Sequence, residues 1–110
     1  MSYRIAQINH TILGLLGDRL RLLSQQSDFL ITIQEVDTAP DLASCKIYLS
    51  FFPTPDKLTI DQFINQARPK LQKTIAQNLF LRKTPKLQLI YDQRPEDLSR
   101  IEKILNKYKD

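Results

Sequence analysis

Hydrophobic residues recur along the chain with two different spacings, and each spacing predicts a type of secondary structure. Between Ser2 and about Ser24 the apolar positions are three or four residues apart, which predicts a helix. They are Ile5, Ile8, Ile12, Leu15 or Leu16, and Leu20. Gly14 and Gly17 each weaken a helix by about 1 kcal/mol relative to alanine, so this helix needs tertiary packing to be stable.

Two strands are predicted in the next part of the chain. Phe29–Val36 is rich in β-branched residues, and its residues alternate along the segment as they do in a strand. In Leu42–Phe52 the apolar side chains again occupy every second position; they are Cys45, Ile47, Leu49 and Phe51. The segment Asp37–Asp41 between them contains residues that favour turns, including Pro40. We therefore expect the two strands to pair in an antiparallel arrangement.

Helical spacing returns between Leu58 and Leu81, but Pro69 interrupts it. A proline cannot donate a hydrogen bond to the residue four positions back, and it disfavours helical geometry at the preceding residue, Arg68. It is well tolerated at the first position of a new helix. The sequence therefore predicts two helices, about 58–67 and 69–81, that meet at a kink near Ala67.

The last part of the chain predicts one more strand and one more helix. Leu87, Leu89 and Tyr91 alternate with Gln88 and Ile90 in the segment 85–92. A helix then starts at Pro95, with an apolar stripe at Leu98, Ile101, Ile104, Leu105 and Tyr108. The order α-β-β-α-α-β-α predicts an α+β fold in which a three-stranded sheet packs on helices. With 110 residues, the chain is expected to form a single domain over residues 1–110.

Charge is distributed unevenly along this domain. The formal net charge is +4, yet residues 62–91 contain six basic residues and no acid, so that this window carries +6 and the remainder −2. The six are Arg68, Lys70, Lys73, Arg82, Lys83 and Lys86. Such a basic block is typical of a surface that binds a polyanion such as a nucleic acid. It is also compatible with a solvated basic surface that has no partner, and charge alone does not separate the two.

The predicted kink offers a candidate site for phosphate. A second helix that starts at Pro69 would expose backbone N–H groups, and its dipole would favour an anion there. Arg68 lies on the break, while Lys70 and Lys73 follow it within a turn. Arg82, Lys83 and Lys86 flank the start of the third strand. The alternative is that Pro69 only bends a helix around the core and that the later cations lie in a solvated loop.

Little else in the sequence indicates chemistry. His10 is the only histidine and Cys45 the only cysteine, so neither a metal site nor a nucleophile with its base is predicted, and no cofactor or small-molecule substrate is expected. Cys45 is on the inward side of its strand and is interpreted as a core thiol. Gly14–Gly17 matches the G-x-x-G of nucleotide-binding loops, but it lies inside an apolar helix and is set aside. Tyr48, Phe51 and Tyr91 could stack on bases, although core positions are favoured.

Two segments resemble the signatures of one protein family. Asp41–Ser50 reads DLASCKIYLS and resembles the strand motif of ribosome-binding factor A, an Asp-Leu pair before a Lys-Val-Tyr-Val-Ser-like run. Leu81–Asp92 reads LRKTPKLQLIYD and resembles its second signature, Leu-Arg-x-x-Pro-x-Leu-x-Phe followed by an Asp. Arg4-Ile5 at the start of an apolar helix also fits. Element order and spacing agree over about residues 3–108.

This resemblance implies a type II KH-like fold and a non-enzymatic role. In the family a helix-kink-helix, typically Ala-x-Gly, replaces the G-x-x-G loop, and the matching positions are Ala67, Arg68 and Pro69. Proline in place of glycine is a departure that should stiffen the bend. The family binds the free small ribosomal subunit and promotes 5′-end processing of its precursor rRNA without being the nuclease.

The expected RNA-binding residues are Ala67, Arg68, Pro69, Lys70, Lys73, Arg82, Lys83 and, with the fewest indications, Lys46. The expected partners are the small subunit and its rRNA, and nothing in the sequence demands a dimer. The alternative is a small α+β protein-interaction module with no RNA role; a nuclease is a more distant one. Without a secretory signal, an apolar run of about 20 residues or a possible internal disulfide, the chain is expected to be cytoplasmic and free of the membrane.

Overall fold

The computed structural model describes residues 2–92 of the chain. Helix α1 (Ser2–Ser24) is followed by strands β1 (Leu30–Thr38) and β2 (Ser44–Phe52), helix α2 (Lys57–Asn78) and strand β3 (Lys86–Tyr91). The predicted last helix, from Pro95 onward, lies outside the described residues. The α+β arrangement of three strands and accompanying helices is confirmed, with strand limits one or two residues from those expected.

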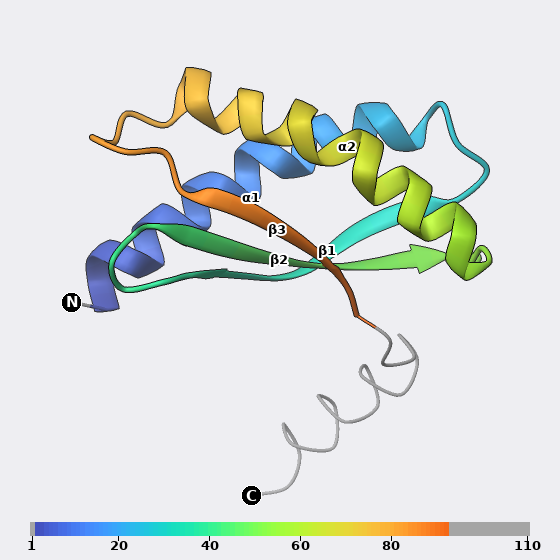
Figure 1. Ribbon diagram of the computed structural model, residues 1–110, viewed down its shortest axis with the longest axis horizontal. Helices are drawn as coiled ribbons and strands as arrows, with labels where there is room; N and C mark the ends of the chain where they lie inside the picture. The colour runs from blue at the N-terminus through green and yellow to red at the C-terminus, as the bar shows by residue number, and fades with distance from the viewer. Residues whose placement is uncertain (1, 93–110) are drawn as a thin grey trace, which may run out of the picture.

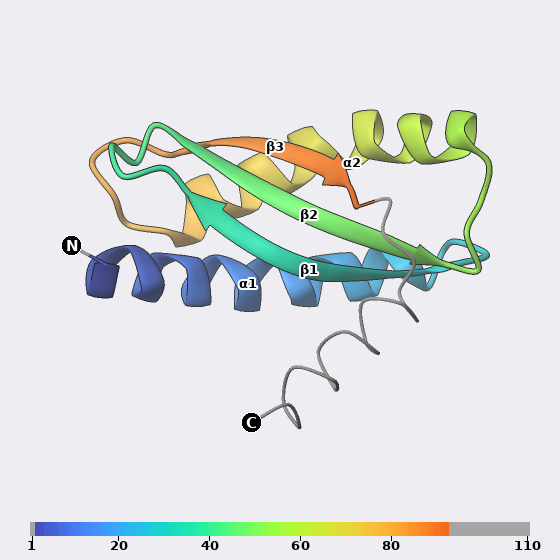
Figure 2. The ribbon, with the colours of Figure 1, turned by 90° about the horizontal axis from the view of Figure 1, so that it is seen from below.

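The three strands form one sheet in the order β1-β2-β3 (Figure 2). As predicted, β1 and β2 are antiparallel; their register shifts between Ile33 and Glu35. Strand β3 runs parallel to β2, with Cys45 opposite Leu87. Parallel neighbours need a crossover connection of a dozen or more residues, and α2 provides it. The crossover brings the end of α2 and the start of β3 to the end of the molecule where α1 begins (Figure 1).

Both helices cover the same face of the sheet (Figures 1 and 2). Side chains from the two helices and from inward positions of β2 and β3 meet there and form one core; they are Ile8, Ile12, Leu16, Leu20, Cys45, Ile47, Leu49, Phe51, Ile60, Ala67, Leu71, Ile75 and Leu87. The predicted alternation in β2 is confirmed, because its odd-numbered positions from Cys45 to Phe51 are buried. Asn9 joins α1 to the end of β1, since its Oδ1 accepts hydrogen bonds from the backbone N–H (3.1 Å) and hydroxyl (2.6 Å) of Thr38.

Helix α2 differs from the expectation of two helices, because it is continuous from Lys57 to Asn78 with Pro69 inside it. Its axis changes direction near its middle (Figure 2), so the bend is present but the break is not. The reason lies in the buried positions on the two sides of Pro69, Ile60 and Ala67 before it and Leu71 and Ile75 after it. They form one stripe on the core. Burying a leucine or isoleucine contributes about 1.5–3 kcal/mol, which offsets the cost of about 3 kcal/mol for an interior proline.

The two ends of α2 are also defined by local bonds. Asp56 is the N-cap, and its carboxylate accepts a hydrogen bond from the backbone N–H of Thr59 at 2.8 Å. Hydrogen bonding to the side chain and to the backbone N–H of Thr59 lowers the pKa of the Asp56 carboxyl from its ordinary value. The helix ends at Asn78 rather than at residue 81, because Leu79 adopts an extended conformation while its N–H still bonds to the carbonyl of Ile75.

Candidate nucleic-acid interface

The structure places seven of the eight sequence-predicted binding residues on the surface. Arg68, Pro69, Lys70 and Lys73 are exposed on α2, Arg82 and Lys83 in the loop that follows it, and Lys46 on β2. Ala67 is the exception, because only 2% of it is exposed and it belongs to the core. Its side chain is therefore out of reach of a ligand.

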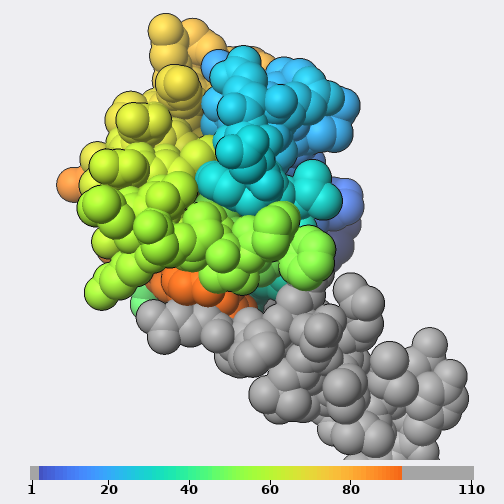
Figure 3. Space-filling model, turned by 90° about the vertical axis from the view of Figure 1, so that its right-hand side faces the viewer, coloured from blue at the N-terminus to red at the C-terminus, as the bar shows by residue number. Residues whose placement is uncertain are grey.

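The cations of α2 do not converge on one point. Successive residues of an α-helix are about 100° apart, and the buried stripe contains Ala67 and Leu71. Arg68 and Lys70 therefore lie on opposite flanks of this stripe, and Lys73 lies on the solvent side. Lys70 lines a cavity of about 160 Å³ together with residues from the end of α1, on the side where α1 lies beside α2 (Figure 3).

The phosphate site expected at a second helix start is not formed. Residues 70–73 lie inside α2, where backbone N–H groups are used within the helix. Pro69 instead deprives the carbonyl of Asn65, four residues back, of its usual donor. This leaves an acceptor rather than a set of donors at the bend, so that only the side chains of Arg68, Lys70 and Lys73 offer positive charge there.

The loop between α2 and β3 is better placed, because it is attached to the core at several points. The Gln72 amide donates to the carbonyl of Pro85 (2.9 Å) and accepts from the backbone N–H of Leu87 (2.9 Å). Pro85 is buried, and Leu79 and Leu81 pack against the core. Arg82 and Lys83 lie between these anchored points and are exposed. The loop therefore presents two cations from an anchored backbone.

Two further lysines lie on the open face of the sheet at its end next to this loop. Lys86, the first residue of β3, is opposite Ser44, and Lys46 is opposite Gln88. Residues two apart on a strand point to the same face, so Lys46 and Lys86 share the face that the helices do not cover. Asp37 of β1 is opposite Lys46 on its other side. Lys46 therefore has an acid beside it, whereas no acid occurs anywhere in the window that contains Arg82, Lys83 and Lys86.

The other residues weighed for chemistry have structural positions. Cys45 is buried, burial raises the pKa of its thiol, and its Sγ lies 3.4 Å from the Thr38 hydroxyl oxygen. Phe51 makes edge-to-face contacts with Phe29, Phe63 and Tyr91 at centroid distances of 5.5, 5.8 and 5.7 Å. The prediction that Cys45 and Phe51 belong to the core is confirmed. Within residues 2–92 no group of acids, cysteines or histidines is arranged to hold a metal ion.

A groove lies along the first half of α2, away from the α2–β3 loop. It has a volume of about 570 Å³ and lies between the first half of α2 and the end of β3, with Ile60, Ile64 and Leu89 in its wall. Its charged residues are Lys57 and Asp61. Because one cation is matched by one acid, this groove does not favour an anion in the way that the α2–β3 loop does.

Comparison with known protein families gives a match over most of the chain. The family model for ribosome-binding factor A matches residues 4–105, which is most of the chain. The chain belongs to the ribosome-binding factor A family. The family is named for its binding to the ribosome. Family membership also agrees with the two sequence signatures, of which the second includes the anchored loop.

Individual family members differ considerably from this chain in sequence. Ribosome-binding factor A of Opitutus terrae is 27% identical over 110 residues, covering 97% of this chain and 88% of its own. That of Legionella pneumophila strain Lens is 31% identical over 77 residues, 70% of this chain and 62% of its own. The Coxiella burnetii protein is 29% identical over 77 residues, and the match spans about 65% of its length.

Solved structures of the family agree with the fold. The crystal structure of ribosome-binding factor A from Thermus thermophilus superposes with a TM-score of 0.68 at 18% identity, over 83% of this chain and 98% of that one. The solution structure of a Thermotoga maritima protein proposed to be a ribosome binding factor A gives 0.68 at 28% identity, over 87% and 93%. Structures of this family have a KH-like fold, and so does this chain. Neither described helix is both long and apolar enough to cross a membrane.

Proposed function

We propose that this chain binds the free small ribosomal subunit through its rRNA and promotes the late maturation of that subunit, including 5′-end processing of the precursor rRNA. In this proposal the protein holds RNA in a conformation that other factors process, and it cleaves nothing itself. The family supports association with a ribosome. The more specific proposal, that the partner is the rRNA of the small subunit, depends on the basic surface.

The observation that carries this proposal is the anchored basic loop. Gln72 fixes the start of β3 to α2 through two hydrogen bonds of 2.9 Å, and Arg82 and Lys83 project just before that start. Arginine and lysine bind phosphate without reading sequence, and an anchored backbone loses less conformational entropy on binding. We therefore place the main phosphate contacts at Arg82 and Lys83.

Cations on α2 extend this surface. Lys73 lies on the solvent side of α2, and Arg68 lies on one flank of its buried stripe. Both can reach phosphates of a backbone that crosses the outside of the helix, whereas Lys70, on the opposite flank, contacts a different part of the RNA. Lys46 would contribute least, because Asp37 is its register partner on β1.

Co-sedimentation with purified small subunits tests the proposal. The double variant Arg82→Ala/Lys83→Ala should lose most of its binding. The matched control is Arg19→Ala/Arg21→Ala, which removes the same charge from exposed positions of α1, about 20 Å along the helix from its first turns. The control should bind as the wild type does. Equal loss in both variants would show that total charge, and not this loop, determines binding.

Salt dependence separates RNA binding from protein docking. If about four phosphates are neutralised, the logarithm of the binding constant should fall with the logarithm of salt concentration with a slope of about −3. Binding that does not change between low and moderate salt would instead identify a protein-interaction module. The processing role is tested in cells that lack the protein, where precursor rRNA with an unprocessed 5′ end should accumulate and the wild-type chain should remove it.

A further inference from the structure

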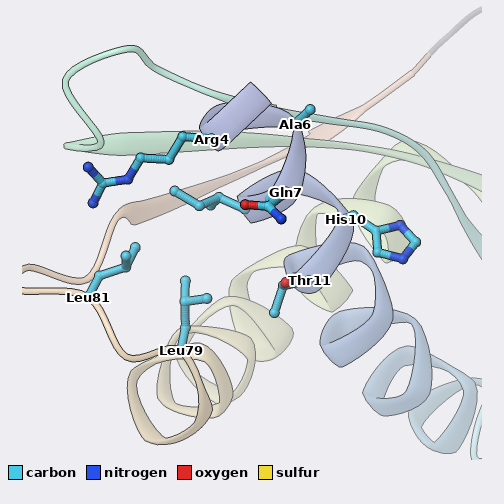
Figure 4. Close-up of a pocket in the computed structure, with 8 residues that line it drawn as sticks. Arg4, Ala6, Gln7, His10, Thr11, Leu79 and Leu81 are labelled. Carbon is cyan, nitrogen blue, oxygen red and sulfur yellow. The ribbon is translucent and has the colours of Figure 1, made fainter. Parts of the chain in front are cut away.

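A shallow groove lies between the first turns of α1 and the loop that follows α2 (Figure 4). Its volume is about 590 Å³. Leu79 and Leu81 form one wall, and Ala6, Gln7, Ile8 and Thr11 contribute to the other. Arg4 and His10 lie at its two ends; the Arg4 side chain extends toward the side of Leu81, and His10 points away from both leucines (Figure 4).

The charges around this groove have one sign. None of its lining residues is acidic, and the first turn of α1 contains no acid either. Arg4 lies in that turn, at the helix end where the dipole is positive. Arg82 and Lys83 follow Leu81 directly and are exposed. An apolar wall thus lies next to three permanent cations from two different elements, Arg4 of α1 and the two residues of the loop.

Phe80 adds an exposed aromatic side chain to the same loop. It lies between the half-buried Leu79 and Leu81, and 94% of it is exposed. Among the large apolar residues that the structure describes as exposed, the next highest value is 73%, at Tyr3. Single apolar residues are common on surfaces and mean little alone. Here, however, Phe80 belongs to an anchored loop, stands in the chain between the two leucines that line the groove, and precedes two cations.

We propose that this end of the molecule binds a short unpaired stretch of RNA, in which one base stacks on Phe80 while the phosphates on either side contact Arg4 and Arg82. The groove against Leu79 and Leu81 accepts the neighbouring nucleotide. This inference rests on the proposed function and adds the form of the RNA, which is single-stranded at this contact. Stacking on a side chain requires a base whose face is free, and the bases inside a duplex are stacked on one another.

Nucleotides fit this combination of features better than an acidic peptide does. A peptide would satisfy the cations and could place an apolar side chain in the groove, but it has no need of an exposed ring. Each nucleotide carries one phosphate and one flat aromatic base, which matches a loop that offers both cations and an exposed ring. The ring at position 80 therefore distinguishes the two ligands, and the test is built on it.

The test measures binding of a labelled single-stranded oligoribonucleotide of about eight nucleotides by fluorescence anisotropy at low salt. Phe80→Ala should weaken binding about fivefold or more, because base–aromatic stacking of this kind has been assigned about 1–3 kcal/mol by alanine substitution. Phe80→Trp should retain it. The matched control is Phe52→Ala, since Phe52 is also strongly exposed, at 65%, but lies at the end of β2; it should bind as the wild type does.

An unchanged affinity in Phe80→Ala would overturn the inference. So would an equal loss in Phe52→Ala, or a hairpin of the same length that binds with the same affinity and the same dependence on Phe80. A poly-glutamate peptide that competes equally well would also overturn it, since it would identify a general polyanion surface. All variants are first compared by thermal unfolding, and Phe80→Trp keeps the test valid if alanine perturbs the loop.

Failure of this inference is distinguishable from failure of the proposed function. If Phe80→Ala binds the oligonucleotide normally but Arg82→Ala/Lys83→Ala still loses small subunits, the ribosomal role stands and only the single-stranded contact is wrong. If no variant and no wild-type protein sediments with small subunits, the proposed function fails whatever the oligonucleotide shows.

Discussion

Replacing Pro69 by alanine should stabilise the protein, although proline stands at the bend of α2. The residues on both sides of Pro69 are helical, and the position is exposed. Alanine restores the N–H that can bond to the carbonyl of Asn65 and removes the clash of the proline ring with that carbonyl. The change therefore repairs a regular helix without adding volume to the core.

The size of the expected stabilisation depends on how α2 packs on the two sides of residue 69. In an isolated helix the difference between proline and alanine at an interior position is about 3 kcal/mol. Here the bend is already fitted to the core through Ala67 and Leu71, which are buried, so straightening α2 costs part of that gain. We expect the free energy of unfolding to rise by about 1–3 kcal/mol, or the melting temperature by several degrees.

Urea denaturation followed by circular dichroism measures this change. The midpoint should move to higher urea while the slope of the transition stays the same, because the surface exposed on unfolding is unchanged. A midpoint that stays constant or falls would refute the reasoning, since it would mean that residue 69 occupies a real break that alanine cannot continue.

The same variant also tests where binding resides. In our account the cationic side chains contact RNA and the bend does not, so Pro69→Ala should sediment with small subunits as the wild type does. A more stable protein that no longer binds would contradict this, because it would show that the bent axis itself positions the cations.

Other substitutions give independent predictions. Gln72→Ala should lower the free energy of unfolding by about 1–3 kcal/mol, because it leaves the buried N–H of Leu87 without its acceptor. The control Gln77→Ala, at an exposed position of the same helix, should change it little, and equal effects of the two variants in urea denaturation would contradict this. Asp56→Ala should lower the melting temperature at neutral pH, and the difference from the wild type should shrink in acid. A carboxyl whose pKa is lowered by folding stabilises the fold above its ordinary pKa and loses this effect as the pH falls through the lowered pKa. A difference in melting temperature that persists in strong acid would disprove this. Cys45 should react with a thiol reagent only after unfolding, because burial raises the pKa of its thiol, and fast labelling of the native protein would show otherwise.

The sequence predicted the strands well because a half-buried strand has a simple period. Cys45, Ile47 and Leu49 are all buried, and the polar residues between them face away from the helices. This alternation does not predict that β3 is parallel to β2, because the two-residue period of a strand is the same in either direction. The parallel direction follows from the crossover through α2, which became visible only in the assembled fold.

The break at Pro69 was a reasonable local prediction that tertiary packing overrode. Local rules assign the cost of an interior proline, but they do not include the burial of Leu71 and Ile75 beyond it. The prediction of the binding site has the same limit, because part of the site depends on tertiary contacts. Arg82 and Lys83 could be named from charge alone, whereas the anchoring role of Gln72 depends on a contact with Leu87, fifteen residues away.

The sequence pattern does not single out Phe80, because Phe80 lies next to Leu79, the last residue of an apolar stripe, and within the helix predicted for residues 69–81. The helix in fact ends at Asn78, and the extended Leu79 turns the next side chain to the surface. A possible signal was its spacing, since residue 80 does not belong to the stripe of Leu71, Ile75 and Leu79. Arg4 was noted for the family signature but not for the groove, which two distant segments form together.

The most direct test of the central claim is crosslinking from the loop to native small subunits. A photoreactive amino acid in place of Arg82 is irradiated in the complex, and the same residue in place of Arg21 of α1 serves as the control. The account predicts crosslinks to rRNA from position 82 and few or none from position 21. Crosslinks from position 82 that map only to ribosomal proteins, or equal RNA yields from both positions, would contradict it.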